Sequence, residues 1–128
     1  LAQILGEAAV DLPSHYFDEP KAEYLRRRDL MVARLNAMDG VFCPNPGGAF
    51  YAIAQLPIDD SDRFCQWLLE EFRHEKQTVM LAPATGFYGT AGLGKKEVRL
   101  AYVLNLTDLS AAMDCLEEAI RQYPGRSA

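Results

Sequence analysis

Long apolar runs are absent from this sequence, and none approaches the roughly 20 residues that a membrane-spanning helix needs. Residues 1–10 are too short for a secretory signal and lack a basic start. We therefore expect neither a membrane segment nor export, and predict a cytoplasmic location. The sequence begins with Leu1 instead of methionine, which we expect of a fragment, although trimming would give the same start.

Metal ligands and paired cysteines are also scarce. The three cysteines, Cys43, Cys65 and Cys115, form no CxxC pair, and two of them lie in segments that read as apolar helix faces. We interpret them as buried small hydrophobes, not as a disulfide framework. His15 and His74 are the only histidines, so we expect no metal site.

The sequence has no excess of basic charge, since its formal net charge is −5. Proteins dedicated to nucleic acids or anionic membranes present a basic field, so we expect neither partner. Arg26, Arg27 and Arg28 are consecutive, but successive residues of a helix point in different directions. We interpret them as a solvated face with local ion pairs.

Apolar spacings of three and four predict helices over residues 1–8, 20–40, 61–72 and 107–123. Gly40 is expected to close the second helix in a left-handed conformation, Ser61 to cap the third, and Asn105 or Thr107 to cap the fourth. Strands are predicted at residues 41–42, 49–54, 78–81 and 97–103. This order predicts an α+β fold, in which helices cover one face of a small sheet of about three to four strands.

A glycine-rich stretch precedes the last predicted strand. Residues 89–96 match the Gly-x4-Gly-Lys pattern of a phosphate-binding loop, but Lys96 stands where Ser or Thr should hold magnesium. Such a loop must also open a helix, whereas this one opens a strand. We therefore expect no nucleotide site.

Arg99 is the most informative residue of the last strand. It shares one strand face with Ala101 and Val103, while Val98 and Leu100 lie on the other, so both faces are largely apolar and the strand should be central. A guanidinium in such a setting needs an anion. The pattern alone favours a structural carboxylate over a ligand carboxylate.

The loop before Arg99 carries two aromatic residues, Phe87 and Tyr88. They could close over a ligand beside Arg99, or could simply anchor the loop on the core. The sequence shows no nucleophile with a base at motif spacing and no convincing carboxylate pair. The residues therefore predict a chain that holds an anion and has no catalytic group of its own.

Three short segments occur together: Pro44 with Gly48-Ala49-Phe50-Tyr51, Pro83 with Gly86-Phe87-Tyr88, and Val98-Arg99-Leu100-Ala101-Tyr102. Their order and spacing resemble the C-terminal domain of class I/II aminotransferases, fold-type-I pyridoxal-phosphate enzymes with aspartate aminotransferase as type member. The resemblance runs from about Tyr16 to Tyr123. It implies that residues 1–15 are the tail of a large-domain helix and a connector, and that residues 16–128 form the C-terminal small domain, entered by a long domain-connecting helix.

The resemblance also implies roles for two residues. The arginine matching Arg99 binds the α-carboxylate of the amino-acid substrate, and Phe87 lies on a mobile part that closes over it. The usual Pro-Gly start of that part reads Pro83-Ala84 here, with Gly86 displaced. The implied partners are amino-acid and 2-oxo-acid substrates, an N-terminal large domain and a second subunit in a homodimer.

The family's Schiff-base lysine has no counterpart in this sequence. Lys21, Lys76, Lys95 and Lys96 are the only lysines, and none lies in a Ser/Thr-rich, glycine-containing stretch. The resemblance implies that the full-length enzyme uses pyridoxal phosphate, whereas this chain alone should bind no cofactor and be inactive. The alternative is a stand-alone α+β domain that binds a small acid, or another protein, without catalysis.

Overall fold

The computed structural model describes residues 2–127. The elements in chain order are α1 (Ala2–Val10), η1 (Ser14–Phe17), α2 (Asp18–Ala37), β1 (Tyr51–Gln55), α3 (Ser61–Glu70), β2 (Ala82–Pro83), η2 (Thr85–Phe87), β3 (Glu97–Ala101) and α4 (Leu106–Gln122). No helix among them is both long enough and apolar enough to cross a membrane.

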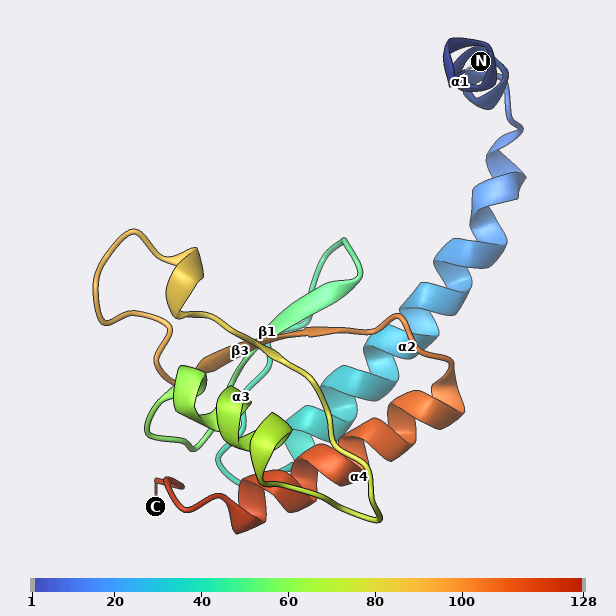
Figure 1. Ribbon diagram of the computed structural model, residues 1–128. Helices are drawn as coiled ribbons and strands as arrows, with labels where there is room; N and C mark the ends of the chain where they lie inside the picture. The colour runs from blue at the N-terminus through green and yellow to red at the C-terminus, as the bar shows by residue number, and fades with distance from the viewer. Residues whose placement is uncertain (1, 128) are drawn as a thin grey trace.

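The sheet has three antiparallel strands in the order β1-β3-β2, so β3 is central, as predicted. Helices α2, α3 and α4 lie on one side of it, below the strands in Figure 1. The other side of the sheet is open within the described chain. The predicted α+β fold with helices on one face is confirmed.

The core forms where the apolar helix faces meet the covered side of the sheet. α3 contributes a stripe of Phe64, Cys65 and Leu68, continued by Phe72 beyond its end, and all four are buried. β3 contributes Val98 and Leu100, and the large buried side chains of α2 and α4 are Met31, Leu35, Leu109, Met113, Leu116 and Ile120. Leu69, predicted to widen the stripe of α3, is 47% exposed because it lies beside the covered face and not on it.

The helix ends agree with the expected chemistry, with one correction. Gly40 has a φ of +75° and Asn105 caps α4 by accepting from the Asp108 amide at 2.9 Å, both as predicted. The cap of α3 is Asp60, not Ser61, because the Asp60 carboxylate accepts from the backbone amides of the first turn. Ser61 is instead fully buried, and its hydroxyl donates to the Gly94 carbonyl at 3.0 Å.

Two of the predicted strands are wrong or reduced. Residues 41–42 contribute only an isolated bridge between Phe42 and Gln55. Residues 78–81 form no strand, and β2 begins only at Ala82. The Thr78 hydroxyl donates to the Leu68 carbonyl at 2.6 Å, which ties this segment to α3, and a cavity of about 400 Å³ lies between the segment and α4. Ladder pairing with β3 therefore starts later than the apolar run suggests.

All three cysteines are free and buried, as predicted, and burial raises the pKa of the Cys65 thiol to about 11. The local ion pairs predicted for the consecutive arginines are present: Arg26 and Arg27 pair with Glu23, and Arg28 pairs with Asp29. The predicted solvated face holds only for Arg26, because Arg27 and Arg28 are half-buried and donate to the carbonyls of Val103 and Pro46.

The amino-terminal part of the chain projects away from the core (Figure 1). α1 has no buried residue, and its Ile4, Leu5 and Val10 are 67%, 64% and 83% exposed. Tyr16 and Phe17 in η1 are also more than half exposed. Apolar side chains gathered on an extension of this kind are typical of a surface that packs against another unit.

A buried tyrosine should make stability fall at alkaline pH. Tyr123 donates to Asp59 at 2.9 Å, and its burial together with this hydrogen bond raises its pKa to about 12. Because the folded pKa lies above the unfolded value of about 10, this stabilisation is complete below pH ~10 and is lost as the pH rises towards 12. Tyr123→Phe should lower the free energy of unfolding by about 1–2 kcal/mol at pH 7, measured by urea unfolding.

The same comparison at higher pH tests the sign of the effect. The difference between wild type and Tyr123→Phe should shrink between pH ~10 and 12 as the wild-type hydroxyl ionises. Tyr16→Phe is the control, since Tyr16 is 58% exposed. A difference that stays constant across this range would contradict the assigned role of the Tyr123 hydroxyl.

Candidate functional site

The candidate site lies on the open face of the sheet. Arg99 in β3 pairs with Ile53 in β1 on one side and with Ala82 in β2 on the other. Directly paired residues share a face, so these three side chains point the same way. Ala101, two residues on, lies on this face too and leaves space beside the guanidinium. The fold therefore presents Arg99 at the middle of the sheet.

Arg99 is exposed, and this corrects part of the sequence prediction. Val98 and Leu100 are buried, whereas Arg99 and Ala101 are exposed. The strand is central, as expected, but only one of its apolar faces is covered. The three packed helices all lie on the opposite side of the sheet, so none of the described helices covers Arg99.

The guanidinium of Arg99 lies between two aromatic rings. Its central carbon is 5.4 Å from the ring centroid of Tyr51 and 4.9 Å from that of Phe87. Both distances fall within the range of cation–π contact. Phe87 and Arg99, the two residues singled out from the sequence, are thus brought together.

Within residues 2–127, Arg99 forms no ion pair with a carboxylate. The structural-carboxylate interpretation, which the strand pattern favoured, therefore finds no partner in the described chain. Glu97 is the acidic residue nearest in sequence on the same face, but its carboxylate accepts a hydrogen bond from the Tyr88 hydroxyl. This hydrogen bond is the largest cause of a raised pKa for Tyr88, which lies above its usual range.

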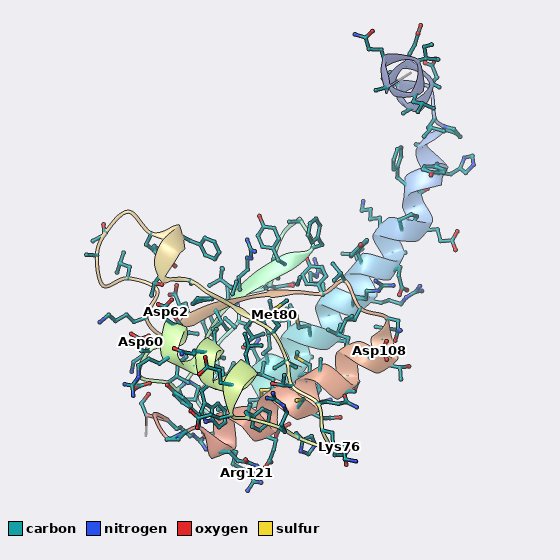
Figure 2. All side chains as sticks on the ribbon, viewed as in Figure 1. Asp60, Asp62, Lys76, Met80, Asp108 and Arg121 are labelled. Atoms are coloured by element: carbon teal, nitrogen blue, oxygen red, sulfur yellow. The ribbon has the colours of Figure 1, made fainter. Side chains whose placement is uncertain are left out.

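The segment that carries Phe87 is fastened on both sides. Before Phe87, the Thr85 hydroxyl donates to Asp62 at 2.7 Å, and Figure 2 shows Asp62 at the start of α3, beside this loop. After it, Tyr88 donates to Glu97. The Ala84 amide also donates to the Glu97 carbonyl at 3.0 Å. Of the two aromatic residues, Tyr88 therefore anchors the loop, and Phe87 contacts Arg99.

Tyr51 is the site residue that the sequence interpretation missed. From the sequence, Tyr51 lies in a predicted strand and in one of the segments that carry the family resemblance, but no role in the site is assigned to it. Tyr51 opposes Ala101, which puts it on the face of Arg99 and one diagonal step away from it.

The described residues supply no obvious cofactor or metal site. No group of three or more His, Cys, Asp or Glu residues between 2 and 127 is arranged to hold a metal ion. Lys21 lines a groove on α2, Lys76 lies in the turn after α3, and Lys95 and Lys96 lie in the turn before β3.

The α+β fold and the sequence together place this chain in the family of pyridoxal-phosphate aminotransferases. More particularly, the chain corresponds to the small domain of the aspartate and aromatic aminotransferases, to which it is homologous along most of its length. It is 34% identical over 105 residues to an aspartate aminotransferase of Pyrococcus horikoshii, covering 80% of this chain and 25% of that protein. An aspartate aminotransferase of Musicola paradisiaca is 35% identical over 78% of this chain and 24% of its own length.

Solved structures agree with these sequence relatives. The aspartate aminotransferase of Thermotoga maritima superposes with a TM-score of 0.69 at 30% identity, covering 89% of this chain and 26% of the other. An alanine aminotransferase from Pyrococcus furiosus has a TM-score of 0.75 at 24% identity, covering 91% of this chain and 28% of the other, and shows the fold alone. No family model matches the chain. The chain spans about a quarter of the length of the relatives it matches.

Proposed function

We propose that this chain provides the carboxylate-binding part of a pyridoxal-phosphate-dependent aminotransferase. The observation that carries the proposal is Arg99, an arginine at the centre of a sheet face that has no carboxylate partner among residues 2–127. Arginine presents a planar fork of N–H donors that matches a carboxylate with two parallel hydrogen bonds. Phe87 would exclude water from that pair.

The part of this chain in the reaction is orientation. A carboxylate held by Arg99 fixes one end of the amino acid, and packing of the open face against the rest of the enzyme would remove water and strengthen the pair. The exposed face and the Phe87 loop support this role, because the hydrogen bonds of Thr85 and Tyr88 hold Phe87 beside Arg99 on the uncovered side of the sheet. No residue of the chain is proposed to move a proton.

Pyridoxal phosphate, when bound, supplies the electron sink of transamination. The lysines of this chain do not fit that cofactor, because none of the four lies in a Ser/Thr-rich, glycine-containing stretch of the kind that holds the Schiff-base lysine. We therefore propose that a large domain outside residues 1–128 binds it, and that residues 1–15 connect to that domain while residues 16–128 form the small domain. A homodimer in the cytoplasm, with aspartate among its amino-acid substrates, is the arrangement that the resemblance favours.

The exposed residues of α1 and η1 bear on the rival interpretation. A stand-alone domain that binds a small acid or another protein should bury its own apolar side chains, whereas Ile4, Leu5 and Val10 are mostly exposed. Such a surface favours a domain that packs against a larger unit.

The coding sequence upstream of Leu1 tests the proposal directly. We expect the open frame to continue for a few hundred codons and to contain a lysine in a Ser/Thr-rich, glycine-containing stretch. The purified full-length product should then show the absorption band of a lysine-bound cofactor, while residues 1–128 alone should not. A frame that begins at Leu1 would contradict the enzyme proposal and leave Arg99 to a binding module.

A further inference from the structure

We infer that Tyr51 is a positioning residue for Arg99, so that the guanidinium is held in its binding orientation before a carboxylate arrives. This inference rests on the proposed carboxylate site and adds a residue to it. It follows from three features of the open face: the register of β1 against β3, the contacts of the Arg99 guanidinium with the rings of Tyr51 and Phe87, and the hydrogen bond from Tyr88 to Glu97.

The register places Tyr51 where it can contact Arg99 and little else on that face. Tyr51 is paired with Ala101, so the neighbouring position is occupied by a methyl group and the ring can lean across it towards Arg99. Diagonal neighbours across antiparallel strands are about 7–8 Å apart at Cα, within reach of an aromatic and a long side chain. The observed 5.4 Å between the Arg99 central carbon and the ring centroid is that diagonal contact.

The two rings come from separate elements, each held by its own contacts. Tyr51 is held by the ladder between β1 and β3, and its ring meets Phe50 edge-on at 5.7 Å. Phe87 is held through the hydrogen bonds of Thr85 and Tyr88. With Phe87 alone the Arg99 guanidinium would have one aromatic contact, and the ring of Tyr51 restricts its motion further.

Aromatic faces position an arginine without using its hydrogen-bond donors. The ring attracts the cation through its π-face, so the N–H groups in the guanidinium plane stay available for a carboxylate fork. An acidic partner would position Arg99 equally well, but it would occupy those donors. Glu97, the acidic residue nearest in sequence on this face, accepts from Tyr88 and forms no ion pair with Arg99 within residues 2–127. The arrangement therefore holds the charge in place and leaves its ligand-binding edge open.

The consequence is a saving in entropy on binding. An unrestrained arginine side chain has considerable rotamer entropy, part of which is lost when a ligand immobilises it. A guanidinium that is already restrained loses less. Removal of the Tyr51 ring should therefore loosen Arg99 in the free protein, and weaken carboxylate binding, without unfolding the domain, because Tyr51 is 42% exposed.

The test measures the mobility of Arg99 directly, by ¹⁵N relaxation of its Nε–H group in residues 1–128. Wild type and Tyr51→Phe should give an order parameter close to that of the rigid backbone, about 0.85, and Tyr51→Val should fall below about 0.6. Val keeps the strand preference of the position. Tyr51→Thr serves as a second β-branched variant, and the amide spectrum establishes that each variant is folded.

Phe42→Leu is the matched control. Phe42 is an aromatic residue 62% exposed, and it bridges to Gln55 on the side of β1 away from β3. Its removal should leave the mobility of Arg99 unchanged. An Arg99 order parameter in folded Tyr51→Val and Tyr51→Thr equal to that of wild type would overturn the inference.

A kinetic readout separates this inference from the proposed function. In the full-length enzyme, Tyr51→Val should raise KM about three- to tenfold with little change in kcat, which corresponds to about 0.65–1.4 kcal/mol, the scale of a cation–π contact, and Tyr51→Phe should keep the wild-type KM. If Arg99→Gln has no effect on activity, the carboxylate site is wrong even where Tyr51 restrains Arg99. If Arg99→Gln is inactive while Tyr51→Val has wild-type KM and mobility, only the positioning role fails.

Discussion

Replacement of Arg99 by glutamine should lower kcat/KM for the amino-acid substrate of the full-length enzyme by about 10²–10³-fold. This corresponds to about 3–4 kcal/mol, the scale of a charge-assisted pair lost from a desolvated site. Glutamine keeps a polar side chain of moderate length but offers one donor group where arginine offers a charged fork. The loss should appear in the kinetics with both the amino acid and the oxo acid, because both carry the carboxylate that Arg99 is proposed to bind.

Two further variants test whether the loss of kcat/KM comes from the guanidinium fork of Arg99 or from the removal of any exposed positive charge. Arg99→Lys keeps the charge but not the fork, and should fall between wild type and glutamine. Arg121→Gln is the matched control: Arg121 is an exposed arginine near the end of α4, paired with Glu118 and far from the open face in Figure 2. An Arg99→Gln enzyme with unchanged kcat/KM would show that the carboxylate is bound elsewhere.

Gly94→Ala should reduce the free energy of unfolding of residues 1–128 by about 3 kcal/mol or more. Gly94 has a φ of +77°, and a Cβ placed there would lie 2.7 Å from the Ala84 carbonyl carbon and 2.8 Å from its oxygen. The left-handed conformation costs an alanine about 1–2 kcal/mol, and forced overpacking costs about 1–3 kcal/mol more. The Ala84 backbone must move, and this shifts the neighbouring η2 turn that carries Phe87.

Gly92 provides the control for the backbone part of this cost. Its φ of +90° is also left-handed, but a Cβ there would meet no atom within 4 Å. Gly92→Ala should therefore cost only about 1–2 kcal/mol. Both are measured by urea unfolding, in which the midpoint moves and the slope stays constant. Equal losses for the two variants would mean that the contact with Ala84 contributes nothing.

The parts of the fold that the sequence predicts are those governed by local periodicity. Helical spacing predicts α2, α3 and α4, and a two-residue alternation predicts β3 around Arg99. A strand prediction at residues 78–81 fails because an apolar run carries no information about its partner. Residues 78–81 do not pair with β3, and the Thr78 hydroxyl donates to the carbonyl of Leu68 in α3.

The site is only partly predictable for a related reason. Arg99 and Phe87 are recognisable as a charge and an aromatic residue in neighbouring segments, and the fold does bring them together. Tyr51 becomes visible only once β1 and β3 are in register, because nearly fifty residues separate it from Arg99. The exposure of Arg99 could not be predicted at all, since a strand with two apolar faces looks the same whether its cover lies within the chain or outside it.

The antiparallel register of β1 and β3 also limits how this domain can change over evolution. Removal or addition of one residue within β3 would exchange its two faces, sending Arg99 towards the helices and Leu100 into water. Substitutions can be tolerated along the strand, but a change of its length by a single residue cannot. Insertions and deletions in related sequences should therefore fall in the turn that precedes β3, where an altered loop length leaves the parity of the strand intact.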